Sequence, residues 1–221
     1  MDDQSTPDIR HDWTLAQAQA LFDMPLTELL FHAQGMHRRH QPHDAVQLAT
    51  LLSIKTGSCP EDCGYCSQSA RNKTGLESEA LLSVDTVLEK ARQAKELGAS
   101  RFCMGAAWRS PKKDSRQFDQ VLEMVRGVRA LGMEACVTAG MLDREQADQL
   151  KQAGLTAYNH NIDTSREHYD KVITTRTFDD RLETIKHVAD AGIHVCSGGI
   201  LGLGEGDTDR VSMLVTLATL T

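Results

Sequence analysis

The fold is decided by a short motif that occurs four times, first as Glu-Leu-Gly-Ala-Ser-Arg-Phe-Cys-Met-Gly at residues 96–105. An amphipathic helical pattern stops there at Gly98, and a strand-like run begins at Arg101, after two intervening residues. Glycine is the usual residue just after a helix, because it adopts the left-handed backbone conformation at little cost. Short loops from a helix to the next strand are typical of parallel α/β units.

The same helix, glycine and strand pattern returns three more times. It predicts strands at residues 134–138, 156–160 and 194–197, after Gly132, Gly154 and Gly192. An apolar run at 46–54 adds an earlier strand, and 207–220 reads as a final helix. Repeated units of this kind form a doubly wound sheet or a barrel. Five strands are about three fewer than an eight-unit (βα) barrel of about 250 residues needs.

The N-terminal part predicts two helices outside these repeats. Thr14 and Gln17 form a capping box that opens a helix to about Phe22, and Pro25 opens a second helix to about His40. We therefore expect a disordered segment at 1–11 and a partial barrel domain at 12–221, with a helical extension at 12–42. No closing element follows the last helix, so we expect a fragment or a shortened form that makes little product alone.

Composition excludes several classes of protein. Apolar residues make up 40% and charged residues 25% of the chain, as in soluble globular proteins. The net charge of −7 disfavours broad binding to nucleic acid or anionic membranes. No apolar run reaches the roughly 20 residues that span a bilayer, and the acidic N-terminus is followed by no signal-peptide core. The sequence predicts a cytoplasmic protein without a membrane or nucleic-acid partner.

Three of the six cysteines lie within eight residues, as Cys59, Cys63 and Cys66. Structural zinc normally takes four ligands in two pairs, and no second pair is present. A thioredoxin-like role for Cys63 and Cys66 leaves Cys59 without a function. Three cysteines suit a four-iron cluster in which one iron keeps an open coordination site, since full ligation needs four. Three unligated thiols in a loop are the alternative.

The other cysteines, Cys103, Cys136 and Cys196, follow the helix-ending glycines by five, four and four residues. This spacing predicts equivalent strand positions that face one layer of a barrel lumen. By the same count Tyr158 is the equivalent residue of the fourth strand, so no fourth ligand comes from there. Each cysteine alone is typical of a small buried side chain. With three cysteines in register, a second metal centre and three small buried side chains are about equally favoured.

The cysteine motif, with Tyr65 before its last cysteine, resembles that of radical S-adenosylmethionine enzymes. Four longer stretches resemble the biotin synthase family and occur in the family's order, and the likeness covers about residue 13 to the end. These stretches are Leu-Ser-Ile-Lys-Thr-Gly-Ser-Cys-Pro-Glu-Asp-Cys (52–63), Arg-Phe-Cys-Met-Gly-Ala-Ala-Trp (101–108), Tyr-Asn-His-Asn-Ile-Asp-Thr (158–164) and Val-Cys-Ser-Gly-Gly-Ile-Leu-Gly-Leu-Gly-Glu (195–205).

The resemblance implies a radical-SAM TIM-type (βα) barrel, homodimers and two iron–sulfur clusters. The first cysteine group would hold a [4Fe–4S] cluster that binds S-adenosylmethionine, and the second a [2Fe–2S] cluster that donates sulfur to dethiobiotin. The family takes the fourth [2Fe–2S] ligand, an arginine, from a strand beyond the fifth. An electron donor such as flavodoxin or ferredoxin would supply the electrons.

The resemblance also implies residues for the cofactor. Asn161 and Asp163 would bind its ribose, with Asn161 also touching dethiobiotin, although strand-end turn residues are the alternative. Arg181 is a candidate for the methionine carboxylate, because arginine binds carboxylates bidentately; a solvated helix arginine is the alternative. The remaining predicted cofactor contacts are Tyr65, Ala106, Ala107, Trp108, Gly198, Ile200, Gly202 and Glu205.

Three other functions stay open. The first is another radical-SAM enzyme, such as lipoyl synthase or a maturation enzyme. Lipoyl synthases carry a further cysteine cluster near the N-terminus, whereas residues 1–58 contain no cysteine. The second is a non-catalytic iron–sulfur protein, which would have no need of Asn161, Asp163 or the 198–205 strand. The third is an inactive partial barrel.

Overall fold

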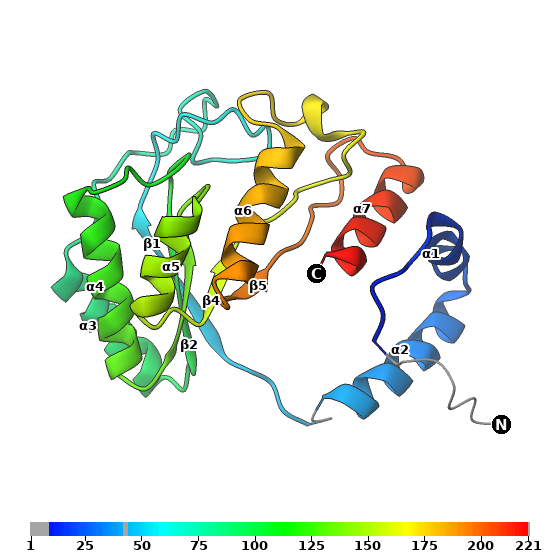
Figure 1. Ribbon diagram of the computed structural model, residues 1–221, viewed down its shortest axis with the longest axis horizontal. Coiled ribbons are helices and arrows are strands. Elements are labelled where there is room, and N and C mark those ends of the chain that lie inside the picture. The colour runs from blue at the N-terminus through cyan, green and yellow to red at the C-terminus, as the bar shows by residue number, and fades with distance from the viewer. Residues whose placement is uncertain (1–8, 42–43, 221) are drawn as a thin grey trace.

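A curved, fully parallel sheet forms the centre of the computed structural model, which describes residues 9–41 and 44–220 (Figure 1). Within these residues five strands pair in the order of the sequence. They are β1 (Ala49–Lys55), β2 (Arg101–Ala106), β3 (Glu134–Thr138), β4 (Ala157–Asn159) and β5 (His194–Cys196). The predicted partial barrel is therefore confirmed.

Helices connect the strands and lie along one face of the sheet (Figure 1). Those that follow β1 to β5 are α3 (Val84–Glu96), α4 (Arg116–Ala130), α5 (Arg144–Gln152), α6 (Phe178–Asp190) and α7 (Asp207–Thr219), with a short helix η1 (Tyr169–Lys171) before α6. The extension forms α1 (Leu15–Phe22) and α2 (Leu26–His40), and α1 packs against α7. Residues 1–8 of the segment expected to be disordered lie outside the described part. No helix in the described residues is long and apolar enough to cross a membrane.

Side chains at the helix starts explain where the elements begin. The hydroxyls of Thr14, Ser83, Ser115 and Thr177 and the carboxylate of Asp143 each accept a hydrogen bond from a backbone amide in the first turn. Such caps satisfy amides that have no partner within the helix. The four glycines that end the predicted helices have φ angles of 71° to 93°. The four glycines thus end the helices in the left-handed conformation that the sequence predicts.

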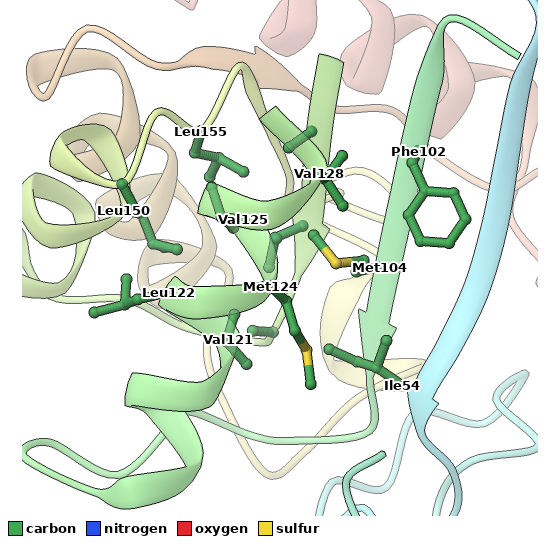
Figure 2. Close-up of a cluster of buried hydrophobic side chains, with 14 of the residues drawn as sticks. Ile54, Phe102, Met104, Val121, Leu122, Met124, Val125, Val128, Leu150 and Leu155 are labelled. Carbon is green, nitrogen blue, oxygen red and sulfur yellow. The ribbon is translucent and has the colours of Figure 1, made fainter. Parts of the chain in front are cut away.

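The main core lies between the sheet and helices α3 to α5 (Figure 2). Phe102 and Met104 of β2 pack there and are almost fully buried. Successive side chains of a strand point to opposite faces, so Cys103 and Gly105 face the inside of the curved sheet. This alternation creates two environments, an apolar layer under the helices and a more polar lumen.

Replacing Met104 with Ala should lower the free energy of unfolding by about 2–5 kcal/mol, because it leaves a cavity in a packed core. Leu97→Ala is the matched control, since that side chain is 86% exposed. Urea unfolding followed by circular dichroism measures both. Equal midpoints for the two variants would contradict this core assignment.

Candidate active site

A cavity of about 280 Å³ opens at the carboxyl ends of the strands. Barrel enzymes of this kind place their active sites at that end. The cavity is lined by ten residues that the sequence predicts as ligands or cofactor contacts: Cys59, Cys63, Tyr65, Cys66, Ala106, Ala107, Trp108, Asn161, Asp163 and Arg181. Cys59 and Arg181, which are 122 residues apart in the chain, therefore share one site.

The loop after β1 is held so that its three cysteines face this cavity. The Ala70 amide donates to the Cys59 carbonyl at 2.8 Å. The side-chain amide of Asn72 donates to the carbonyls of Cys63 and Cys66, both at 2.9 Å. These bonds hold the backbone of the motif at each of its three cysteines.

The thiols of Cys59 and Cys63 lie in a buried environment. Burial raises the pKa of both. For Cys63, the Arg176 guanidinium acts in the opposite direction, with Nη2 at 3.7 Å from Sγ. Three soft sulfur donors on one wall of a cavity, with a cation beside one of them, fit an iron–sulfur cluster.

No group of three His, Cys, Asp or Glu side chains within the described ranges is close enough for a single metal ion. A four-iron cluster does not need such convergence, because each cysteine binds a different iron.

A buried ion pair joins two predicted cofactor residues. Nη2 of Arg181 contacts the Asp163 carboxylate, and Nε donates to the Tyr169 hydroxyl at 2.9 Å. The side chains of the pair are 5% and 1% exposed. Burial raises the pKa of Asp163, and the nearby Arg181 charge opposes this. The alternative of a solvated helix arginine is wrong, because the Tyr169 hydroxyl and the Asp163 carboxylate hold the guanidinium in the cavity wall.

Cys103 and Cys136 face each other directly across β2 and β3. The nearby Cys136 thiol lowers the pKa of Cys103, whereas the Cys103 thiol and burial raise the pKa of Cys136. Cys103 precedes Gly105, which lines the cavity, by two residues on the same face. The pair therefore lies one step deeper in the lumen than the first cysteine group.

The predicted equivalence of the three cysteines is wrong for Cys196, which lies on the lumen face two residues beyond His194, the residue in the row of Cys136. The residue of β4 opposite Cys136 is Ala157, and that opposite Cys196 is Asn159. The predicted equivalence of Tyr158 is wrong: its hydroxyl donates to the Gly140 carbonyl at 2.6 Å, and the ring packs in the core under the helices. Counting from the glycine fails because the loops into β3 and β4 differ in length.

The segment after β5 is held by its own acidic residue. The Glu205 carboxylate accepts hydrogen bonds from the amides of Gly202 and Leu203 at 2.8 and 2.6 Å, and pairs with Arg210 at 2.9 Å. Four of the predicted cofactor contacts lie outside the lining of this cavity: Gly198, Ile200, Gly202 and Glu205. Both carboxylate oxygens of Glu205 are bonded within the chain, where they hold the turn at Gly202 and Leu203. A ligand at this turn would therefore contact its backbone.

The sequence matches the model of the radical SAM superfamily over residues 53–217. The chain belongs to the radical SAM superfamily. Biotin synthases from Methylobacterium sp. (strain 4-46) and Paramagnetospirillum magneticum are each 61% identical to it, over 98% and 96% of the chain. That of Colwellia psychrerythraea is 61% identical over 96%. The chain spans 61–65% of the length of these relatives.

Solved structures support the radical SAM fold. Methylornithine synthase (PylB) superposes with a TM-score of 0.77 at 20% sequence identity, over 93% of this chain and 61% of that one. HydG, a maturase of the [FeFe]-hydrogenase, gives 0.73 at 19% identity, over 91% and 46%. At this level of identity the likeness concerns the fold alone. Membership of the superfamily brings a [4Fe–4S] cluster and S-adenosylmethionine as cofactors.

Sequence reasoning missed the two acidic residues inside the radical SAM cysteine motif. The Asp62 carboxylate accepts hydrogen bonds from the backbone amides of Thr174 and Thr175 at 2.9 and 3.2 Å and from both hydroxyls. Burial opposes ionisation, but these bonds hold the pKa of Asp62 well below its usual range. The pair of carboxylates between the cysteines was the available signal, although their partners 112 residues later could not be identified from it.

Asp62→Asn should lower the free energy of unfolding by about 1 kcal/mol at pH 7, since an amide cannot accept all of these hydrogen bonds. The folded pKa lies below the ordinary value of 3.8. Ionised Asp62 therefore stabilises the fold above about pH 4, and this contribution is lost as the pH falls further. Urea midpoints at pH 7 and pH 3, with exposed Asp119→Asn as control, should show the variant and parent converging in acid. A difference that does not change with pH would refute the assignment.

Proposed function

We propose that this protein is a biotin synthase, which inserts sulfur into dethiobiotin by radical chemistry. The observation that carries the proposal is the presence of two cysteine groups at two depths of one lumen. The first is the superfamily motif, whereas the second distinguishes this chain from a general radical SAM enzyme. Relatives that are 61% identical over nearly the whole chain carry the name biotin synthase.

Cys59, Cys63 and Cys66 would hold the [4Fe–4S] cluster. When bound, the cluster and S-adenosylmethionine supply a carbon radical that breaks an unactivated C–H bond, which no side chain does as an acid or base. The protein binds and orients the reactants and keeps water from a reactive centre. The carboxyl ends of the strands and the cysteine loop line this cavity.

Asp163 and Arg181 would hold the polar ends of the cofactor. A carboxylate suits ribose hydroxyls, and a guanidinium suits the methionine carboxylate. The contacts of Arg181 within the chain use Nε and Nη2, and a guanidinium carries five N–H donors. It can therefore bind a ligand without leaving Asp163. Asn161 lines the same cavity and would contact both cofactor and dethiobiotin.

Cys103, Cys136 and Cys196 would hold the [2Fe–2S] cluster that serves as sulfur donor. The first two cysteines lie opposite each other on β2 and β3, and the Asn159 amide lies 3.4 Å from the sulfur of Cys196. We further propose that the protein is a homodimer and lies in the cytoplasm. A flavodoxin or ferredoxin would supply the electrons that reduce its clusters. Biotin synthase is favoured over lipoyl synthase or a maturation enzyme because of this second group. A non-catalytic iron–sulfur protein would leave the Asp163–Arg181 pair unexplained.

The two cysteine groups should separate in experiment. After anaerobic reconstitution, Cys59→Ala should lose about four irons per chain and the formation of 5′-deoxyadenosine, because the iron that anchors the cofactor is absent. Cys196→Ala should lose about two irons and keep 5′-deoxyadenosine formation. Iron analysis and chromatography measure both. Cleavage of S-adenosylmethionine at the parent rate by Cys59→Ala would exclude the cluster site.

Asp163→Asn should weaken binding of S-adenosylmethionine by about 1–3 kcal/mol, the scale of hydrogen bonds to charged groups. The visible absorption of the iron–sulfur clusters should not change, since Asp163 would bind no iron. Equilibrium dialysis measures the affinity, and Asp170→Asn, at an exposed position of η1, is the control. Equal affinity for parent and Asp163→Asn would exclude the ribose role.

A further inference from the structure

Glu61 lies between two of the cysteines and is almost fully buried, with 1% of the residue exposed. A buried carboxylate is costly unless charged or hydrogen-bonding groups compensate it. Here Nη1 of Arg109 lies 3.4 Å from Oε1, and Nε of Arg176 lies 3.7 Å from Oε2. The Thr175 hydroxyl contacts Oε2 as well. The proposed function uses none of these groups.

Arg176 reaches from this carboxylate to the cluster motif. Its side chain is 7% exposed, and Nη2 donates to Sγ of Cys63 at 3.7 Å. A planar guanidinium can contact two partners at once with defined geometry. Glu61 and Cys63 are both fixed by the loop after β1, so Arg176 is held between them.

We propose that Arg176 is a redox-tuning residue of the four-iron site. Its N–H donor at the Cys63 sulfur raises the reduction potential of the cluster, and Glu61 fixes the guanidinium in place while partly offsetting its charge. This inference rests on the proposed function, because it needs the cluster at Cys59, Cys63 and Cys66. It assigns a function to the acidic residue within the motif and to an arginine 113 residues after Cys63.

The direction of the shift in reduction potential follows from the charges at the cluster. Reduction adds an electron to a centre whose thiolate ligands are already negative. A hydrogen-bond donor at a ligand sulfur stabilises the added charge, and such bonds are one of the levers that set cluster potentials. Other nearby cations have other contacts: Arg181 pairs with Asp163, and Lys55 donates to the carbonyls of Gly57 and Ala107. Arg176 is therefore placed to act on the sulfur directly.

The test is a redox titration of the reconstituted protein, followed by the electron paramagnetic resonance of the reduced cluster. Arg176→Gln should keep four irons at the motif and lower the ratio of reduced to oxidised cluster at a fixed potential about tenfold. For a one-electron couple that is a shift of about 59 mV to more negative potential. Arg92→Gln, which removes an exposed arginine of α3, should leave the potential unchanged.

Glu61→Gln should shift the potential in the opposite direction. The amide is isosteric and can still accept from Thr175, but it no longer offsets the charge of Arg176. The two substitutions together separate tuning from support of the loop, because a loss of structural support would not move the potential in opposite directions.

Three outcomes would overturn the inference. An unchanged potential in Arg176→Gln rejects the tuning role. If that variant fails to bind iron, an unchanged or more negative potential in Glu61→Gln rejects it instead. A parent protein without a four-iron cluster refutes the proposed function itself, and iron analysis distinguishes this result from the other two.

Discussion

The alternation of side chains along parallel strands is the constraint on which the rest of the structure depends. In β2 it sends Phe102 and Met104 under the helices and Cys103 and Gly105 into the lumen. The apolar layer holds the sheet together without help from the lumen. Residues for chemistry can therefore occupy the inner face without weakening the core. Stability and function use opposite faces of the same strands.

Three carboxylates of the cysteine loop and the cavity wall are paired with groups of the chain itself. Asp163 is paired with Arg181, Glu61 with Arg176 and Arg109, and Asp62 with two threonines. An unpaired charge at such depth would cost several kcal/mol. These pairs also orient each side chain before any cofactor binds. In a preorganised site, less of the binding free energy is lost to the ordering of side chains when a ligand binds.

Much of this arrangement can be predicted from the sequence, because local rules govern it. Glycines such as Gly98 stop helices wherever they occur, and three closely spaced cysteines must share one loop. Residue pairing across strands follows from loop geometry that composition does not encode, which is why the equivalence of Tyr158 was wrong by one residue. The contacts of Asp62 and Glu61 could not be predicted from the sequence either. They depend on the packing of the loop at Thr174 and Thr175 against the cysteine motif.

The hydrogen bonds between Asp62 and Thr174 and Thr175 also set an order of events during synthesis. The cysteine loop leaves the ribosome 112 residues before its anchor. At about 5–20 residues per second, that delay is about 6–22 seconds. Bringing such distant segments together has an entropic cost that only the intervening strands and helices can offset. The cysteine loop can thus form its local hydrogen bonds early, but Asp62 has no anchor until the first four of the five described strands have been synthesised.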